Sequence, residues 1–193
     1  GQTCSALTRL IIPSKMKDEV CEMIRSRIER YTVGDPLDES TRCGPMVSSK
    51  QQMSVTKYIQ TGIDEGATLI SGGIGMPENL NVGFFVKPTV FADVTPEMTI
   101  WKEEIFGPVL VITTYDSEED ALILANDSIY GLSGAVWSES KERAINFAKG
   151  MRTGQVSVNG GHFNVNAPFG GYKMSGNGRE LGLHGLEEFL EIK

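Results

Sequence analysis

Two kinds of hydrophobic pattern alternate along the chain. Short apolar runs bounded by turn residues predict buried strands, and longer segments with apolar residues every three or four positions predict helices with one apolar face. The expected strands cover residues 8–13, 67–73, 108–115, 132–138 and 154–159, with a further β-rich segment at 84–94. The expected helices begin at about Ser14, span about 49–65, 117–128 and 140–150, and begin again near Arg179.

Turn and capping residues set the ends of these elements. Ser14 and Ser117 stand where an N-terminal cap is expected, and Gly66 stands where the second helix should end. Pro88 lies inside the β-rich segment and favours an edge strand or a bend, because proline cannot donate to a sheet ladder. A long glycine-rich loop is expected from Gly160 to Gly178.

The order of these elements predicts the fold class. Strands that alternate with helices of about 10–17 residues indicate an α/β fold with a largely parallel sheet flanked by helices. A length of 193 residues suits one domain, or a domain with a small appendage. The sequence contains no internal repeat and no Pro/Ser-rich linker.

Composition and charge narrow the possible partners. The chain is 40% hydrophobic and 22% charged, which is ordinary for a globular protein. Its net charge of −7 disfavours binding to a phosphate backbone. No apolar run approaches the ~18 residues that a membrane span needs. We therefore expect neither a nucleic-acid nor a membrane partner.

Cysteine and histidine usage argues against a disulfide framework and against a metal site. Cys4, Cys21 and Cys43 are odd in number, and His162 and His184 lie far from all three in the sequence. The chain has no CxxC or HxxxH spacing, so we expect no metal. Free thiols suit a reducing compartment, and we expect a cytoplasmic location.

The stretch "GQTC" places Cys4 close to the first residue. A free cysteine is most often a small buried hydrophobe, and that is one interpretation. The other is a nucleophile, because a thiolate attacks carbonyl carbon when backbone N–H groups or a nearby cation lower its pKa. Gln2, Thr3 and Ser5 are small or polar neighbours, which suits a tight loop around such a group.

Two acids followed by an apolar pair and a Gly-Pro turn form "EEIFGPV", Glu103–Val109. One interpretation is a polar edge that leads into a core strand. The other is a carboxylate and an aromatic ring presented at the start of a strand, where they could bind a ribose diol and flank a flat ring. Spacing alone leaves both interpretations open.

The tail "APFGGYKMSGNGRELG" lacks a dinucleotide-binding fingerprint. Its glycines are out of register, a loop precedes them, and no second strand with an acidic end follows about 20 residues later. A loop folded over a pocket is the better interpretation. Phe163, Phe169 and Tyr172 would then plug onto the core or line an apolar pocket mouth, and His162 is interpreted as a loop side chain.

Together these segments resemble one family. "GQTC", "TRLIIP", "GDPLDESTRCGPMVS", "GFFVKPTVFADV", "EEIFGPV", "ANDSIYGLSGAVWS", "APFGGYKMSGNGRELG" and "GLEEFLEIK" are similar, in this order, to motifs of the NAD(P)-dependent aldehyde dehydrogenases. The resemblance covers essentially all 193 residues. It implies an aldehyde substrate, NAD or NADP as cofactor, and a homo-oligomeric parent protein, dimer or tetramer.

The resemblance also implies roles for individual residues. Cys4 would be the nucleophile, with its own backbone N–H stabilising the oxyanion of a thiohemiacetal that becomes a thioester. Glu104 would hold the nicotinamide-side ribose, and Phe106 would pack near that ring. Gln51 would approach the adenine-side ribose. The residues implied to line the substrate pocket are Thr3, Ser5, Phe163 and Phe169.

By the same resemblance, residues 1–193 would be the catalytic domain of a longer protein. The upstream cofactor-binding domain, the glutamate general base, an oxyanion-hole asparagine and the terminal oligomerisation strand would lie outside it. We therefore expect negligible dehydrogenase turnover from these residues alone. The alternatives are acyl transfer to coenzyme A or esterase activity at Cys4, or a non-enzymatic binding or structural module.

Overall fold

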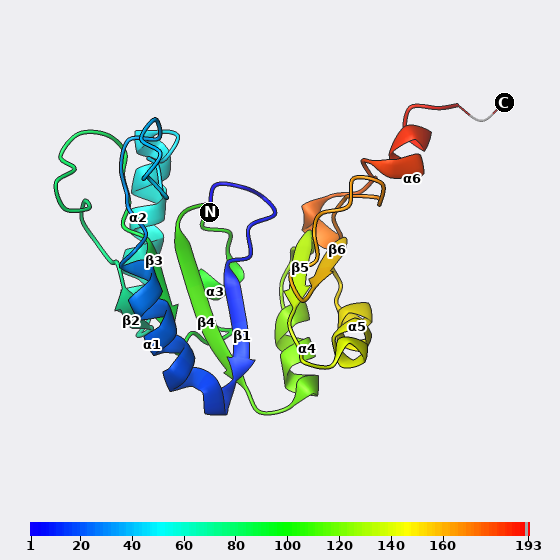
Figure 1. Cartoon of the computed structure of the whole chain (residues 1–193), viewed down its shortest axis with the longest axis horizontal. Coiled ribbons are helices and arrows are strands. Elements are labelled where there is room, and N and C mark those ends of the chain that lie inside the picture. Colours follow the sequence, from blue (N-terminus) through cyan, green and yellow to red (C-terminus); the bar gives the residue numbers. More distant parts are fainter. Residues whose placement is uncertain (192) are drawn as a thin grey trace. The chain divides into compact units, whose positions relative to one another are not determined.

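The computed structural model describes residues 1–191 and 193. The chain divides into two compact units, Gly1–Ala121 and Leu122–Lys193. The boundary falls inside helix α4 (Glu118–Asn126), so each unit holds part of that helix. We describe the units separately (Figure 1).

The first unit is built on a four-stranded sheet with the order β1-β4-β3-β2. β1 and β3 each pair with β4 in parallel, and β2 pairs with β3 in antiparallel orientation, which confirms the expectation of a largely parallel sheet (Figure 1). The elements of this unit before α4 are β1 (Arg9–Pro13), η1 (Ser14–Met16), α1 (Lys17–Ile28), α2 (Ser49–Asp64), β2 (Thr68–Ser71), β3 (Thr89–Ala92), α3 (Thr99–Lys102) and β4 (Val109–Tyr115).

Helices pack on both faces of this sheet. Alternate residues of a strand point to opposite faces, so β3 contributes side chains to both layers of the core. Val90 and Ala92 of β3 join a core cluster with Cys21 of α1. Phe91 points the other way, where a Cβ atom on Gly62 of α2 would lie 3.2 Å from its ring. All four residues of β3 are buried, as expected for a strand covered on both faces.

Two expectations are wrong: the edge-strand alternative for the segment with Pro88, and the helix cap at Ser14. β3 lies between β4 and β2, so the segment with Pro88 does not form an edge strand. Pro88 stands just before Thr89, the first residue of β3, where its missing N–H removes no bond from the ladder. Ser14 does not cap α1, because it lies in η1 and its hydroxyl donates to the carbonyl oxygen of Tyr115 at 3.0 Å.

Other end signals are confirmed. Gly66 follows α2 with φ +91°, a left-handed conformation that glycine adopts without a steric penalty. Ser117 accepts a hydrogen bond from the backbone N–H of Asp120 at 3.1 Å, as a helix cap does. The one-turn helix α3 was not predicted, because its four residues are too few to show a period.

The second unit contains a pair of parallel strands. β5 and β6 run in register, Ser133 opposite Gln155, and α5 connects them, capped by Ser140. The last helix begins at Gly182, three residues later than the predicted Arg179. The elements of this unit after α4 are β5 (Ser133–Val136), α5 (Lys141–Gly150), β6 (Gln155–Val158), η2 (Lys173–Ser175) and α6 (Gly182–Glu187).

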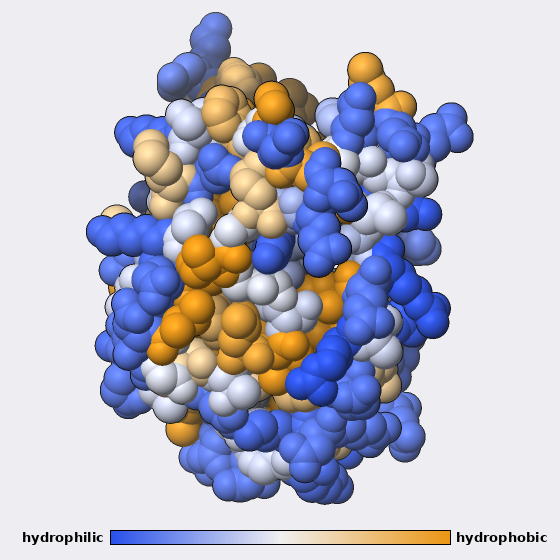
Figure 2. Space-filling model, turned by 90° about the vertical axis from the view of Figure 1, so that its left-hand side faces the viewer, coloured by the Kyte–Doolittle hydropathy of each residue, from blue (hydrophilic) through white to orange (hydrophobic). Residues whose placement is uncertain are grey.

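The side of the first unit that carries α1 and α2 exposes apolar side chains among hydrophilic ones (Figure 2). Met23 of α1 and Met53 of α2 are 50% and 64% exposed. These two side chains therefore contribute little to the core of this unit. Within residues 1–191 and 193, no helix combines the length and the apolar character needed to cross a membrane.

Candidate active site

Cys4 lies in a tight turn just before β1. The backbone N–H of Ala6 donates to the carbonyl oxygen of Thr3 at 3.1 Å, which closes the turn around Cys4 and Ser5. Cys4 and Thr3 are exposed, and Ser5 is half-buried. The interpretation of Cys4 as a buried hydrophobe is therefore wrong, and its thiol is open to a carbonyl compound from solvent.

The side chain of Gln2 fastens this turn to a distant segment. Its amide nitrogen donates to the carbonyl oxygen of Pro45 at 3.3 Å, and its amide oxygen accepts from the backbone N–H of Val47 at 2.9 Å. The residues that it contacts come directly before Ser48, the N-terminal cap of α2. Sequence reasoning treated Gln2 only as a polar neighbour of Cys4, because nothing in the pattern indicates this pairing over 43 to 45 positions.

The turn before β4 packs against the first residues of the chain. A Cβ atom on Gly1 would collide with the carbonyl oxygen of Gly107, so the two backbones are in close contact. This contact follows from topology, since β1 and β4 are parallel neighbours and the segments before them meet at one edge of the sheet. The structure thus brings "GQTC" and "EEIFGPV" together.

Within "EEIFGPV", the two acids have different surroundings. Glu103 accepts a 2.7 Å hydrogen bond from the hydroxyl of Tyr58 on α2. Glu104 is exposed, as Glu103 is, and comes just before the buried Ile105. Phe106 is half-buried with φ +56°, a conformation that is unusual for an aromatic residue and gives the turn a defined shape.

Gln51 of α2 is bonded to the same turn. Its amide nitrogen lies 2.9 Å from the carbonyl oxygen of Phe106 and 3.3 Å from that of Ile105. The resemblance implied contact with the adenine-side ribose, whereas the amide nitrogen donates to protein carbonyls. This arrangement favours a role in holding the turn.

The two pocket phenylalanines belong to the second unit. The rings of Phe163 and Phe169 meet edge to face, with centroids 5.8 Å apart and planes at 72°. Phe169 exchanges backbone hydrogen bonds with Glu180 at 2.7 and 2.6 Å, which anchors one side of the glycine-rich loop. Phe163 is 58% exposed, so it does not plug onto the core of this unit. His162 is an exposed loop residue, as expected.

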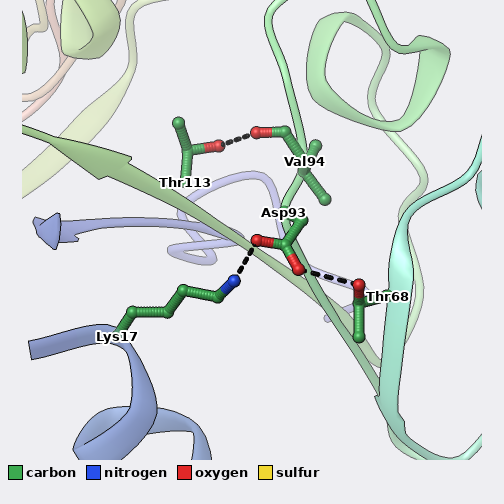
Figure 3. A network of polar contacts seen from close by, with 5 residues as sticks. All are labelled: Lys17, Thr68, Asp93, Val94 and Thr113. Carbon is green, nitrogen blue, oxygen red and sulfur yellow. Dashed lines mark hydrogen bonds and ion pairs between the residues drawn. The ribbon is translucent and has the colours of Figure 1, made fainter.

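A separate polar cluster contains Lys17, Thr68 and Asp93 (Figure 3). Asp93, with φ +56°, pairs with Lys17 and accepts a 2.7 Å hydrogen bond from the hydroxyl of Thr68. These bonds hold the pKa of Asp93 below, and the pKa of Lys17 above, its ordinary value. The cluster joins α1 to the ends of β2 and β3. We interpret it as part of the scaffold, because the carboxyl ends of β1 and β3 lie at the other edge from Cys4.

The remaining thiols are less accessible than Cys4. Burial raises the pKa of Cys21, a core residue of α1, and it also raises that of the half-buried Cys43. Across residues 1–191 and 193 the structure contains no cluster of three or more His, Cys, Asp and Glu side chains that could hold a metal ion. Of the three thiols, Cys4 is the exposed one.

Sequence comparison identifies relatives along the whole chain. The family model described as "Aldehyde dehydrogenase family" matches residues 1–193. A 3-succinoylsemialdehyde-pyridine dehydrogenase from a Pseudomonas species is 50% identical over all 193 residues, which make up 40% of that protein. A putative aldehyde dehydrogenase of Staphylococcus haemolyticus is 45% identical over the same residues, 41% of its length. The chain thus spans about 40% of the length of the curated relatives that it matches.

Solved structures have the same fold. An aldehyde dehydrogenase C mutant from Pseudomonas syringae, in complex with NAD+ and octanal, superposes with a TM-score of 0.97 at 45% identity, covering 99% of this chain and 39% of that one. A Mycobacterium tuberculosis aldehyde dehydrogenase in complex with NAD+ gives 0.95 at 48% identity, covering 98% and 39%. The ordered motifs, the fold and these matches together place the chain in the aldehyde dehydrogenase family.

Proposed function

We propose that this chain carries the catalytic cysteine of an NAD(P)-dependent aldehyde dehydrogenase, as part of a longer protein. The observation that carries the proposal is the exposed Cys4 in a tight turn, with its near neighbour Gly1 packed against the turn of Glu104 and Phe106. Family membership and the NAD+ complexes of two similar structures support the cofactor.

Cys4 is the nucleophile in this proposal. Its thiolate attacks the carbonyl carbon of the aldehyde and forms a C–S bond, and the carbonyl oxygen becomes an oxyanion that the backbone N–H of Cys4 stabilises. Loss of hydride from this thiohemiacetal leaves a thioester on Cys4. Water then adds to the thioester, the C–S bond breaks, and the products are a carboxylic acid and the free thiol.

Glu104 and Phe106 fit part of the cofactor. An exposed carboxylate can accept hydrogen bonds from the two hydroxyls of a ribose, and the half-buried ring of Phe106 next to it offers an apolar face. NAD+, when bound, supplies the acceptor for the hydride. The other cofactor contacts and the general base for hydrolysis would come from outside these residues.

Thr3, Ser5, Phe163 and Phe169 are proposed to contact the substrate. Thr3 and Ser5 flank Cys4 in its turn, and the paired phenylalanine rings offer an apolar surface for an aldehyde's hydrocarbon part. The octanal complex of the similar Pseudomonas syringae enzyme favours an aliphatic aldehyde as the first probe.

The proposal is tested in the full-length protein that contains this chain. Purified protein is mixed with octanal and NAD+, or NADP+, and NADH or NADPH formation is followed by absorbance. Wild type should form reduced cofactor, and Cys4→Ser should lose it almost completely, by at least about a thousandfold. The matched control is Cys43→Ser, which removes a half-buried thiol and should retain activity.

The alternatives give different results in the same assay. Cleavage of activated esters, or acyl transfer to coenzyme A, without reduced cofactor would indicate acyl chemistry at Cys4 instead of dehydrogenation. Wild-type protein with none of these activities would overturn the enzymatic proposal and favour a binding or structural module.

We also infer that the full-length protein is a cytoplasmic homo-oligomer, dimer or tetramer. The family resemblance and the free thiols support this inference. Light scattering of the purified protein measures its mass, and a monomer would contradict the oligomer. Fractionation of cells tests the location.

A further inference from the structure

The N-terminal end of α2 contacts both segments of the candidate site. Pro45 and Val47, directly before the cap residue Ser48, bind the side chain of Gln2. Gln51, three residues after the cap, binds the turn at Ile105 and Phe106. Two glutamine amides thus connect one helix end to the Cys4 turn and to the Glu104–Phe106 turn.

We propose that this helix end is a common platform for the site, and that Gln2 and Gln51 are positioning residues that fix Cys4 and Glu104 independently of each other. The inference rests on the proposed function, because that proposal assigns thiol chemistry to Cys4 and cofactor binding to Glu104. The inference adds Gln2 and Gln51 to the site as residues that act by holding the turns of Cys4 and Glu104.

Gln2 can orient the nucleophile because its amide uses both polar ends. The amide nitrogen donates to the carbonyl oxygen of Pro45, and the amide oxygen accepts from the backbone N–H of Val47. The amide group therefore cannot rotate without losing both hydrogen bonds. Gln2 is half-buried and stands two residues before Cys4. The turn closed between Thr3 and Ala6 therefore begins from a fixed point.

Gln51 can orient the cofactor turn because it donates to two consecutive carbonyl groups. These carbonyls belong to Ile105 and Phe106, directly after Glu104. The backbone N–H of Gln51 is itself bonded to the hydroxyl of Ser48 at 3.2 Å, which fixes where its side chain starts.

One turn further along α2, Val55 supports the same loop. A Cβ atom on Gly107 would lie 2.5 Å from a methyl group of Val55, so the backbone packs directly on the helix. The unusual φ of +56° at Phe106 is thus held from two sides.

The test compares Gln2→Met and Gln51→Met in the full-length protein, with Gln60→Met as the matched control. Methionine keeps the length of glutamine and removes its hydrogen bonds. Gln60 is an exposed residue of the same helix, and its amide nitrogen donates to the carboxylate of Asp64 at 2.7 Å. Three quantities are measured: the rate of Cys4 alkylation by iodoacetamide, the KM for NAD+, and the melting temperature.

If the two glutamines act independently, the effects on Cys4 reactivity and on the KM for NAD+ should occur in different variants. Gln2→Met should change the alkylation rate of Cys4 and lower kcat by about tenfold to a hundredfold, with the KM for NAD+ within twofold of wild type. Gln51→Met should raise the KM for NAD+ by about tenfold, with Cys4 alkylation within twofold. Gln60→Met should change neither.

A merely structural role gives another pattern. If both variants lose thiol reactivity and NAD+ binding in proportion to a lower melting temperature, or behave as Gln60→Met does, the inference is overturned. Should a methionine variant not fold, Gln2→Glu keeps the acceptor for Val47, and Gln51→Lys keeps a donor for the turn. The first should restore part of kcat, and the second part of the NAD+ affinity, and failure of both overturns the inference.

Failure of the proposed function is visible separately. Wild-type protein that forms no NADH from an aldehyde would contradict the dehydrogenase proposal. The alkylation rate of Cys4 in Gln2→Met would still decide whether Gln2 positions the thiol.

Discussion

The hydroxyl of Tyr58 donates a 2.7 Å hydrogen bond to the carboxylate of Glu103 and not to that of the adjacent Glu104, although both residues are exposed. Two neighbouring acids of the same motif thus have different surroundings. Glu103 connects the turn to α2, and we propose Glu104 as the carboxylate that binds the ribose.

We therefore predict different effects for two isosteric changes. In the full-length enzyme, Glu104→Gln should raise the KM for NAD+ by about tenfold, because a hydrogen bond to a charged group contributes about 1.5–3 kcal/mol. Glu103→Gln should change it by less than about threefold. Initial rates at varied NAD+ concentrations measure both.

The control for this pair is Tyr58→Phe, which removes the hydroxyl that bonds Glu103. It should affect NAD+ no more than Glu103→Gln does. A larger effect of Glu103→Gln than of Glu104→Gln would reverse the assignment of the ribose carboxylate.

A second prediction concerns the order in which the thiols react. Cys4 is exposed, whereas Cys43 is half-buried and Cys21 is buried, and burial raises the pKa of the latter two. Since the thiolate is the reactive form, Cys4 should be alkylated first near neutral pH, and Cys21 last. Mass spectrometry of peptides after timed iodoacetamide treatment measures the order. Early modification of Cys21 in folded protein would contradict the packing of α1.

Much of the fold could be predicted from local patterns. The strand at Val109–Tyr115 and the helix at Ser49–Asp64 are long and strongly patterned, and both were predicted to within one residue at each end. The position of β3 inside the sheet could not be predicted, because strand order depends on long-range pairing and not on the residues of the strand. Pro88 led to the alternatives of an edge strand or a bend, and the strand order excludes the edge strand.

The sequence motifs predicted which residues belong to the candidate site, but not the contacts that those residues make. The resemblance identified Cys4, Glu104 and Phe106, but the contact between the segments that carry them follows from the pairing of β1 with β4. The amide contacts of Gln2 and Gln51 join residues 43 to 55 positions apart. A glutamine of this kind has no local signature, because many polar side chains in a sequence could make such bonds.

The ion pair between Lys17 and Asp93 gives a third prediction, on pH and stability. The pKa of Asp93 is lowered, so the pair stabilises the fold above the ordinary value of 3.8 and loses this contribution as pH falls through the lowered pKa. The pKa of Lys17 is raised, so its contribution is complete below 10.5 and is lost as pH rises through the raised pKa.

Asp93→Asn tests this dependence, because asparagine tolerates the positive φ at this position. Since the two side chains are 37% and 43% exposed, the expected loss is small, about 0.5 kcal/mol at neutral pH. Urea unfolding across the pH range should show a constant difference from wild type between about pH 5 and 9 that vanishes in stronger acid. A difference that persists unchanged at low pH would mean that charge is not its cause.

The contact between α2 and α3 gives the last prediction. A Cβ atom on Gly62 would lie 2.8 Å from the Cδ1 atom of Ile100 and 3.2 Å from the ring of the fully buried Phe91. Gly62→Ala should therefore destabilise the protein by about 1 kcal/mol, because overpacking of about 1–3 kcal/mol exceeds the helix-propensity gain of about 1 kcal/mol. Ile100→Val removes Cδ1, so the double variant should lose at least about 0.5 kcal/mol less than the sum of the two single variants. Urea unfolding of all four proteins measures this coupling, and strict additivity would show that Gly62 and Ile100 are not in contact.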